Sequence, residues 1–119
     1  MPAKEFAQKG KKVEEYGADM LCIADSAGSM FPEDLEEYVK EIREVSDIPL
    51  GFHGHNNFEL AVANSLKAYE LGMSVIDTSL QGMGRGAGNT PTEVFVTILE
   101  TKGIRTGINP LEVMDVGEK

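Results

Sequence analysis

The sequence predicts an α/β fold, with about three parallel strands and flanking helices. Helical and strand patterns alternate along the 119 residues. A strand followed by a helix recurs three times at a spacing of about 25 to 30 residues, which is typical of a parallel sheet. A polar or glycine-rich segment follows each predicted strand. These segments are therefore expected at one edge of the sheet, where α/β proteins place their sites.

Three short apolar runs predict the strands. The run from Met20 to Ala24 shows no alternation of polar and apolar residues, which favours a strand buried on both faces. The runs Leu50 to His53 and Val75 to Leu80 predict the second and third strands. The only cysteine, Cys22, lies inside the first run, so we expect a small buried residue rather than a reactive thiol.

The helices are predicted from apolar residues that recur every three or four positions. An N-cap at Thr90 with Glu93 three residues later predicts a capping box for the last of the longer helices. The predicted helices span Pro2 to Tyr16, Pro32 to Val45, Phe58 to Leu71, a segment that opens at Pro91, and a short one at Asn109 to Met114. Their predicted inward faces are Phe6, Val13 and Tyr16; Leu35, Val39, Ile42 and Val45; Leu60, Ala63, Leu66 and Tyr69; and Val94, Phe95, Ile98 and Leu99.

Composition and charge argue against several classes of partner. The net charge of −9 disfavours nucleic acid and anionic membranes as ligands. No segment approaches the roughly 18 apolar residues that span a bilayer, and the N-terminus lacks the apolar core of a signal peptide. One cysteine cannot form an internal disulfide, which favours a reducing compartment. We therefore expect a single cytoplasmic domain over residues 1–119 that binds neither nucleic acid nor a membrane.

The two histidines of the chain, His53 and His55, lie two residues apart at the end of the second predicted strand. Side chains at positions i and i+2 of a strand point to the same face. The spacing suits two ligands of one metal ion, and a chance pair of surface histidines is the alternative. Gly51 and Gly54 favour the metal site, because they let backbone or a ligand come close.

Other polar residues at the strand ends are further candidates. Asn89, at the end of the glycine-rich loop from Gln81 to Asn89, offers an oxygen ligand or caps the last helix. Asp25 offers a carboxylate to substrate, orients a ligand histidine, or caps a turn. Asp77 is expected to support a ligand or the structure rather than to act in catalysis. The loop could also take a carboxylate or phosphate on its amides, but its match to a dinucleotide fingerprint lacks the acidic residue that should follow.

These motifs resemble the DRE-TIM metallolyases, the pyruvate carboxyltransferase-like or HMG-CoA lyase-like family of TIM-barrel enzymes. The glycine loop looks most like the 4-hydroxy-2-oxovalerate aldolase branch. It lacks the cysteine of the CoA lyases, which disfavours that activity. The segments that carry the resemblance are GFHGHNN from Gly51, LAVANS from Leu60, IDTSLQGMG from Ile76, GAGNTP from Gly86 and DSAG from Asp25.

The resemblance implies a partial TIM barrel that binds a divalent metal, with manganese favoured over magnesium, cobalt or zinc. It implies His53 and His55 as metal ligands, with Asn89 coordinating or supporting the metal. The substrate-binding candidates are Asp25, Ser26 and Arg85. The implied reaction is cleavage of a 4-hydroxy-2-oxo acid to pyruvate and an aldehyde. A Claisen-type acyltransferase of the isopropylmalate synthase kind and a non-catalytic, oligomerising barrel fragment are the alternatives.

The chain also departs from the family pattern. Family members begin with a strand carrying Asp-Gly-x-Arg or Asp-Gly-x-His, which supplies a metal-ligating aspartate, a catalytic arginine and, in the aldolases, a histidine base. This motif does not occur here, so the catalytic residues are not assigned. The three strands resemble the sixth to eighth of a barrel that takes about 250 residues. We therefore expect a homo-oligomer or a partner chain that supplies the missing strands. The resemblance also makes an acylating aldehyde dehydrogenase a candidate partner.

Overall fold

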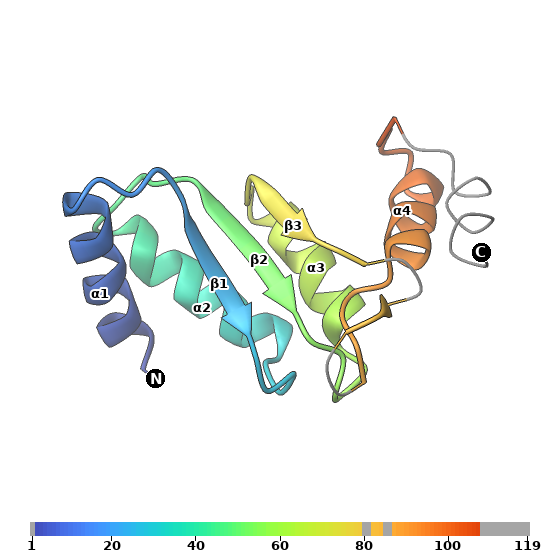
Figure 1. Cartoon of the computed structure of the whole chain (residues 1–119). Coiled ribbons are helices and arrows are strands. Elements are labelled where there is room, and N and C mark those ends of the chain that lie inside the picture. The colour runs from blue at the N-terminus through green and yellow to red at the C-terminus, as the bar shows by residue number, and fades with distance from the viewer. Residues whose placement is uncertain (1, 80–81, 85–86, 108–119) are drawn as a thin grey trace.

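The computed structural model describes residues 2–79, 82–84 and 87–107. In this part of the chain, helices and strands alternate as predicted (Figure 1). The expected short helix at Asn109 to Met114 lies outside the described residues. The elements are α1 (Ala3–Glu15), β1 (Leu21–Asp25), α2 (Pro32–Arg43), β2 (Leu50–Gly54), α3 (Ala61–Glu70), β3 (Val75–Asp77) and α4 (Thr92–Thr101).

The three strands form one parallel sheet in the order β1-β2-β3. Its register sets up rows of side chains across the sheet. Ala24 pairs with His53, and His53 pairs with Asp77. The next row on the same face, two residues towards the start of the strands, consists of Cys22, Gly51 and Val75. The predicted fold class, an α/β arrangement that forms part of a TIM barrel, is confirmed.

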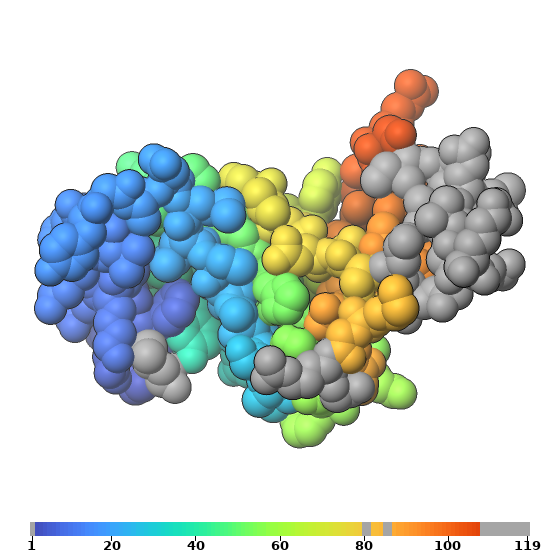
Figure 2. Space-filling model, viewed as in Figure 1, coloured from blue at the N-terminus to red at the C-terminus, as the bar shows by residue number. Residues whose placement is uncertain are grey.

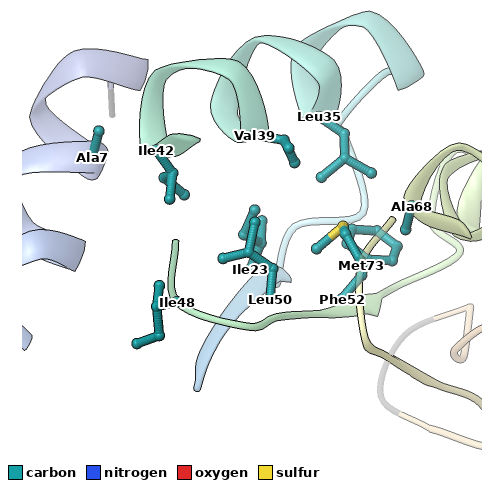
Figure 3. Packing of buried hydrophobic residues seen from close by; sticks show 10 residues of the cluster. All are labelled: Ala7, Ile23, Leu35, Val39, Ile42, Ile48, Leu50, Phe52, Ala68 and Met73. Carbon is teal, nitrogen blue, oxygen red and sulfur yellow. The ribbon is translucent and has the colours of Figure 1, made fainter. Parts of the chain in front are cut away.

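The helices of the described residues cover one face of this sheet. In Figure 1, α2 and α3 lie behind the strands, and α1 packs beside α2. Figure 3 shows apolar side chains of α2 pointing at those of β1 and β2, so the core lies between these layers. The fully buried Leu50 and Phe52 each contribute about 1.5–3 kcal/mol through burial. The core consists of Ala7, Ile23, Leu35, Val39, Ile42, Ile48, Leu50, Phe52, Ala68 and Met73.

The opposite face of the sheet is open in the described part of the chain. Burial alternates along β1: Ile23 and Asp25 are buried, whereas Cys22 and Ala24 are exposed. The expectation that Cys22 is buried is therefore wrong. The apolar run predicts cover on both faces, and the described residues cover one. Figure 2 shows residues of β1, β2 and β3 (blue, green and yellow) lying uncovered on this face.

The prediction of which α3 residues face inward is also wrong. Ala61, Asn64, Ser65 and Ala68 are the buried residues, whereas Tyr69 is 44% exposed. Two of the four are polar, and both have partners in the interior. The Asn64 amide donates to the carbonyl of Met30 at 2.7 Å, and the Ser65 hydroxyl bonds that of Thr90 at 2.8 Å. A pattern of apolar residues cannot predict a helix face whose buried residues are polar and hydrogen-bonded.

Helix α1 fully buries only small residues, and Phe6 is the one member of the predicted stripe that packs against the core. Ala7 and Gly10 are buried, whereas Val13 is 42% and Tyr16 is 89% exposed. A β-carbon at Gly10 would lie 2.7 Å from a terminal methyl of Leu21, so glycine lets the helix approach β1 without moving that side chain. Helix α2 buries Leu35, Val39 and Ile42 as predicted, and Val45 lies exposed beyond its end.

The start of α4 differs from the prediction. Its N-cap is Pro91, no side chain caps it, and the first helical residue is Thr92. The capping box at Thr90 is therefore wrong, because that hydroxyl is buried and bonded elsewhere. The residues that α4 buries are Phe95, Val96 and Leu99, and Val94 is 41% exposed. Within the described residues, no helix combines the length and the apolar character needed to cross a membrane.

We predict that the contact between α1 and the segment after α2 depends on pH. The Ser46 hydroxyl donates to the Glu14 carboxylate, and this bond is the main reason that the pKa of Glu14 is lowered. A carboxyl with a lowered pKa stabilises the fold above its unfolded pKa, and the contribution disappears as the pH falls. Ser46→Ala should therefore lower the midpoint of urea unfolding more at pH 7 than at pH 3.

Ser46 also accepts a hydrogen bond from the Ile48 N–H at 3.0 Å, so part of the loss will be the same at both pH values. Glu14→Gln is the control, because it removes the charge but leaves that backbone bond in place. In Glu14→Gln, the pH-dependent part of the Ser46→Ala effect should vanish. An equal effect of Ser46→Ala at both pH values in the unaltered chain would contradict the prediction.

Candidate metal centre

The two histidines lie at the carboxyl end of β2, on the open face of the sheet. His53 occupies the row between Ala24 and Asp77, and His55 follows one residue after the strand ends. The alternating pleat directs both side chains to the same face. Their ring centroids are 5.0 Å apart, with an angle of 70° between the ring planes. The predicted pairing of the two imidazoles is thus present in the structure.

Asp77 is placed to orient the first of these rings. One carboxylate oxygen of Asp77 lies 3.2 Å from Nδ1 of His53. With the proton on Nδ1, the ring donates to this carboxylate and leaves Nε2 free to coordinate a cation. A carboxylate behind a ligand histidine is common in metal sites, since it sets the orientation of the ring. Asp77 therefore has the supporting position that its place in the third predicted strand suggested.

Asn89 lies beside His55 and has an amide oxygen without a partner. The two residues form an isolated antiparallel bridge. The Oδ1 atom of Asn89 is buried, and no group of the described residues bonds it. Its Nδ2 atom makes only a long contact of 3.4 Å with the Met83 carbonyl. A buried amide oxygen without a donor costs free energy, which a bound cation or water would recover. The alternative role as a helix cap is wrong, because no side chain caps α4.

Glycine is required where the loop passes this amide. A β-carbon at Gly84 would lie 2.7 Å from Nδ2 and 2.9 Å from Oδ1 of Asn89. Any side chain at position 84 would therefore displace the amide or cover the oxygen. Glycine at position 84 therefore leaves the Asn89 amide in the place that the structure shows.

Thr90 anchors the residue that follows Asn89. It is fully buried, and its hydroxyl lies 3.2 Å from the Ala61 carbonyl and 2.8 Å from the Ser65 hydroxyl. A threonine has one hydroxyl proton, which here goes to the carbonyl, so Ser65 must donate to Thr90. This network ties the end of the glycine loop to α3. The sequence analysis missed it, because a threonine before a proline also fits a helix cap.

The substrate-binding candidates lie elsewhere or outside the described residues. Asp25 is 5% exposed, and its two carboxylate oxygens accept hydrogen bonds from the N–H groups of Ser29 and Met30, at 3.2 and 3.1 Å. This is the turn-capping arrangement, on the helix-covered side of the sheet. The position behind His53 belongs to Asp77, so Asp25 does not orient that ring. Ser26 is exposed in the same turn, and Arg85 is not described.

Cys22 is a poor candidate for this site. It lies one row away from His53, opposite Gly51. Partial desolvation raises the pKa of its thiol, and the negative charge of Asp77 adds to the rise. A thiol with a raised pKa stays protonated at neutral pH, and the thiolate is the form that binds metals.

The donors fit a divalent cation but do not complete a coordination shell. The two imidazoles lie together, and Asn89, which pairs with His55 through a backbone bridge, adds an amide oxygen without a partner. Imidazole and amide oxygen form a set of intermediate softness that suits first-row divalent ions. No group of three or more histidine, cysteine, aspartate or glutamate side chains in the described ranges is arranged to hold a metal. The remaining positions would fall to water, substrate or another polypeptide segment.

Comparison with known proteins finds relatives over nearly the whole chain. The chain is 48% identical over 115 residues to a 4-hydroxy-2-oxovalerate aldolase of Geobacillus genomosp. 3, an alignment that covers 97% of this chain and 34% of that protein. A protein of the same name from Carboxydothermus hydrogenoformans is 40% identical over 119 residues, covering 100% of this chain and 35% of the relative. The chain therefore spans about a third of the length of these relatives.

The fold has counterparts among solved structures. The HMG-CoA lyase of Bacillus subtilis superposes with a TM-score of 0.89 at 23% identity, covering 99% of this chain and 42% of that one. At this identity the likeness concerns the fold alone. Residues 1–119 match the family model described as HMGL-like. The chain therefore belongs to the HMGL-like family.

Proposed function

We propose that this chain carries part of the active site of a divalent-metal-dependent aldolase, which cleaves a 4-hydroxy-2-oxo acid to pyruvate and an aldehyde. The observation that carries the proposal is the contact between the His53 and His55 rings at the carboxyl edge of the sheet, beside a bridge from His55 to Asn89, whose buried amide oxygen has no partner. The names of the relatives support the choice of substrate class.

Each residue of the site has a distinct role in this proposal. His53 presents Nε2 to the cation, while Asp77 holds the proton on Nδ1 and keeps the ring in place. His55 presents the second imidazole, and Asn89 supplies an oxygen ligand. We favour Mn²⁺, since a mixed imidazole and oxygen set suits it, with Mg²⁺, Co²⁺ and Zn²⁺ as alternatives.

The cleavage breaks the bond between C3 and C4 of the substrate. The C4 hydroxyl loses its proton and becomes the carbonyl of the aldehyde. The electron pair of the broken bond passes to the 2-oxo acid fragment, which takes up a proton at C3 and leaves as pyruvate. A divalent cation bound at this site would stabilise the negative charge that develops on the 2-oxo oxygen. No residue of this chain is assigned as the base that removes the hydroxyl proton.

The proposal includes partners. The sheet would be completed by further strands from another polypeptide segment or from copies of this chain, in the cytoplasm. Cleavage releases a reactive aldehyde, so an acylating aldehyde dehydrogenase is a candidate consumer of that product.

Binding of pyruvate tests the function directly. The chain saturated with Mn²⁺ should bind pyruvate in a calorimetric titration, because the 2-oxo and carboxylate oxygens can occupy the open coordination positions. Binding should be absent from the metal-free chain and from His53→Ala. Acetate, which lacks the 2-oxo group, is the matched ligand control and should bind much more weakly. Equal binding of pyruvate with and without Mn²⁺ would contradict the proposal.

A further inference from the structure

The segment that follows β2 runs antiparallel to the end of the glycine loop. His55 and Asn89 form the first rung, as an isolated bridge. The N–H of Asn56 donates to the carbonyl of Gly88 at 2.8 Å. At the third position the side chain of Asn57 forms the hydrogen bond in place of the backbone. Its Oδ1 accepts a hydrogen bond from the N–H of Ala87 at 2.9 Å. A side-chain amide thus supplies the last rung of a ladder that begins at the metal centre.

The same side chain reaches the loop that follows β1. The Nδ2 atom of Asn57 donates to the carbonyl of Ala27 at 2.8 Å. The N–H of Phe58 donates to the carbonyl of Gly28 at 3.2 Å. These segments are in tight contact, since a β-carbon at Gly28 would lie 2.7 Å from the backbone nitrogen of Asn57. Asn57 therefore bridges the loops after β1 and β3 with its donor and its acceptor.

We propose that Asn57 is a positioning residue for the metal centre: its amide holds the glycine loop in the pairing that keeps Asn89 opposite His55. The inference rests on the proposed metal site. The Asn89 side chain has only one long hydrogen bond of its own, so its position depends on the backbone that carries it. A glycine-rich segment loses much conformational entropy on ordering, so each hydrogen bond that fixes it is needed to offset that cost.

The arrangement requires a side chain with one donor and one acceptor at the same end. A carboxamide supplies both, a carboxylate supplies acceptors alone, and alanine supplies neither. Asn57→Ala should thus remove both links, whereas Asn57→Asp should keep the bond from the Ala87 N–H and lose the one to Ala27. Asn57 is exposed, so its replacement leaves the apolar core intact.

Asn56 provides the matched control. It has the same side chain at the neighbouring position, but its Oδ1 accepts from the N–H of Ala61 at 3.1 Å, where α3 begins. Its link to the glycine loop is made by the backbone and survives replacement of the side chain. Asn56→Ala should therefore lower the thermal stability of the chain through loss of a helix-end bond, with little effect on the position of Asn89.

Calorimetric titration of the full chain with Mn²⁺ is the first measurement. Asn57→Ala should weaken the affinity about 10-fold or more, the effect seen when groups that orient metal ligands are removed. Asn57→Asp should recover most of that loss, and Asn56→Ala should stay within about threefold of the unaltered chain. Unchanged affinity in Asn57→Ala, or an equal loss in both alanine variants, would overturn the proposal.

Amide hydrogen exchange on the metal-free chain is the second measurement, and it does not depend on metal binding. Exchange of the N–H at position 56, bonded to Gly88, should accelerate about three- to tenfold in Asn57→Ala but not in Asn56→Ala. If the unaltered chain takes up no Mn²⁺, the proposed function fails, and this exchange alone decides the role of Asn57. An unaltered exchange rate at position 56 would then overturn it.

Discussion

Replacing His53 or His55 by alanine is expected to abolish binding of a divalent metal ion to this chain. The described residues bring two imidazoles and one amide oxygen to the site, so each histidine supplies a third of the protein ligands. Removing a group that only orients a ligand costs about 10- to 100-fold in metal affinity, and removing a ligand should cost more. Asp77→Ala, which takes away the carboxylate behind His53, should fall within that smaller range.

Elemental analysis after dialysis against Mn²⁺ measures this effect. The unaltered chain should retain metal and both histidine variants should lose it. Cys22→Ala is the control, since it alters the neighbouring row of the same open face and should retain metal. Equal metal contents in the unaltered chain and in the two histidine variants would exclude this site.

The arrangement of strands and helices could be predicted because it depends on short-range patterns. The apolar runs around Ile23 and Leu50 fold as strands within one or two residues of the expected limits. Pro32 opens α2 as expected, and Asp34 accepts a hydrogen bond from the N–H of Phe31 at 2.9 Å. Both signals are contained in a few adjacent residues, so no knowledge of distant partners is needed.

Several of the wrong predictions depend on partners far away in the sequence. Asn64 and Ser65 face inward on α3 because they bond Met30 and Thr90, which lie 34 and 25 residues away. Thr90 fits a helix cap locally, and only the folded chain shows that Ala61 takes its proton. Cys22 is exposed because, among the described residues, nothing covers its face of the sheet. The amino-acid composition of β1 cannot show whether that face of the sheet is covered.

The residues of the candidate site fall into the same two groups: those predicted from local spacing and those placed by distant parts of the fold. The pairing of His53 with His55 follows from their spacing on one strand, which sequence alone reveals. The places of Asp77 and Asn89 depend on strand register and on the path of a glycine loop. Asn57 resembles a simple helix-start residue in the sequence, and its bonds to Ala27 and Ala87 exist only in the fold.

The chain is expected to associate with copies of itself at micromolar concentration. Its sheet has three strands, and β1 and β3 are both unpaired edges in the described part of the chain. Eight strands close a barrel of this kind, so the face that a barrel encloses stays open here (Figure 2). Met20 and Val75 are each 42% exposed, and Cys22 and Ala24 lie exposed between them. Contiguous apolar surface of this kind drives association.

The β3 side of the molecule is incompletely packed as well. A cavity of about 340 Å³ lies between β3, α3 and α4, and its lining includes Ile76, Phe95 and Leu99. The net charge of −9 opposes association, but charges on the helices lie away from the open face and are screened by salt. Burial of the open face should therefore outweigh repulsion, more so as ionic strength rises. A symmetric pair of chains is the simplest arrangement that buries it.

Light scattering at several concentrations and two salt concentrations measures the mass. It should exceed the 12.9 kDa of one chain and rise with salt. Val75→Lys puts a charge on the open face and should shift the mass towards that of a monomer. Val13→Lys is the matched control, because Val13 on α1 has the same 42% exposure but lies away from the open face. A cooperatively folding monomer at micromolar concentration would refute the prediction. Equal masses for the two lysine variants would show that the open face is not the interface.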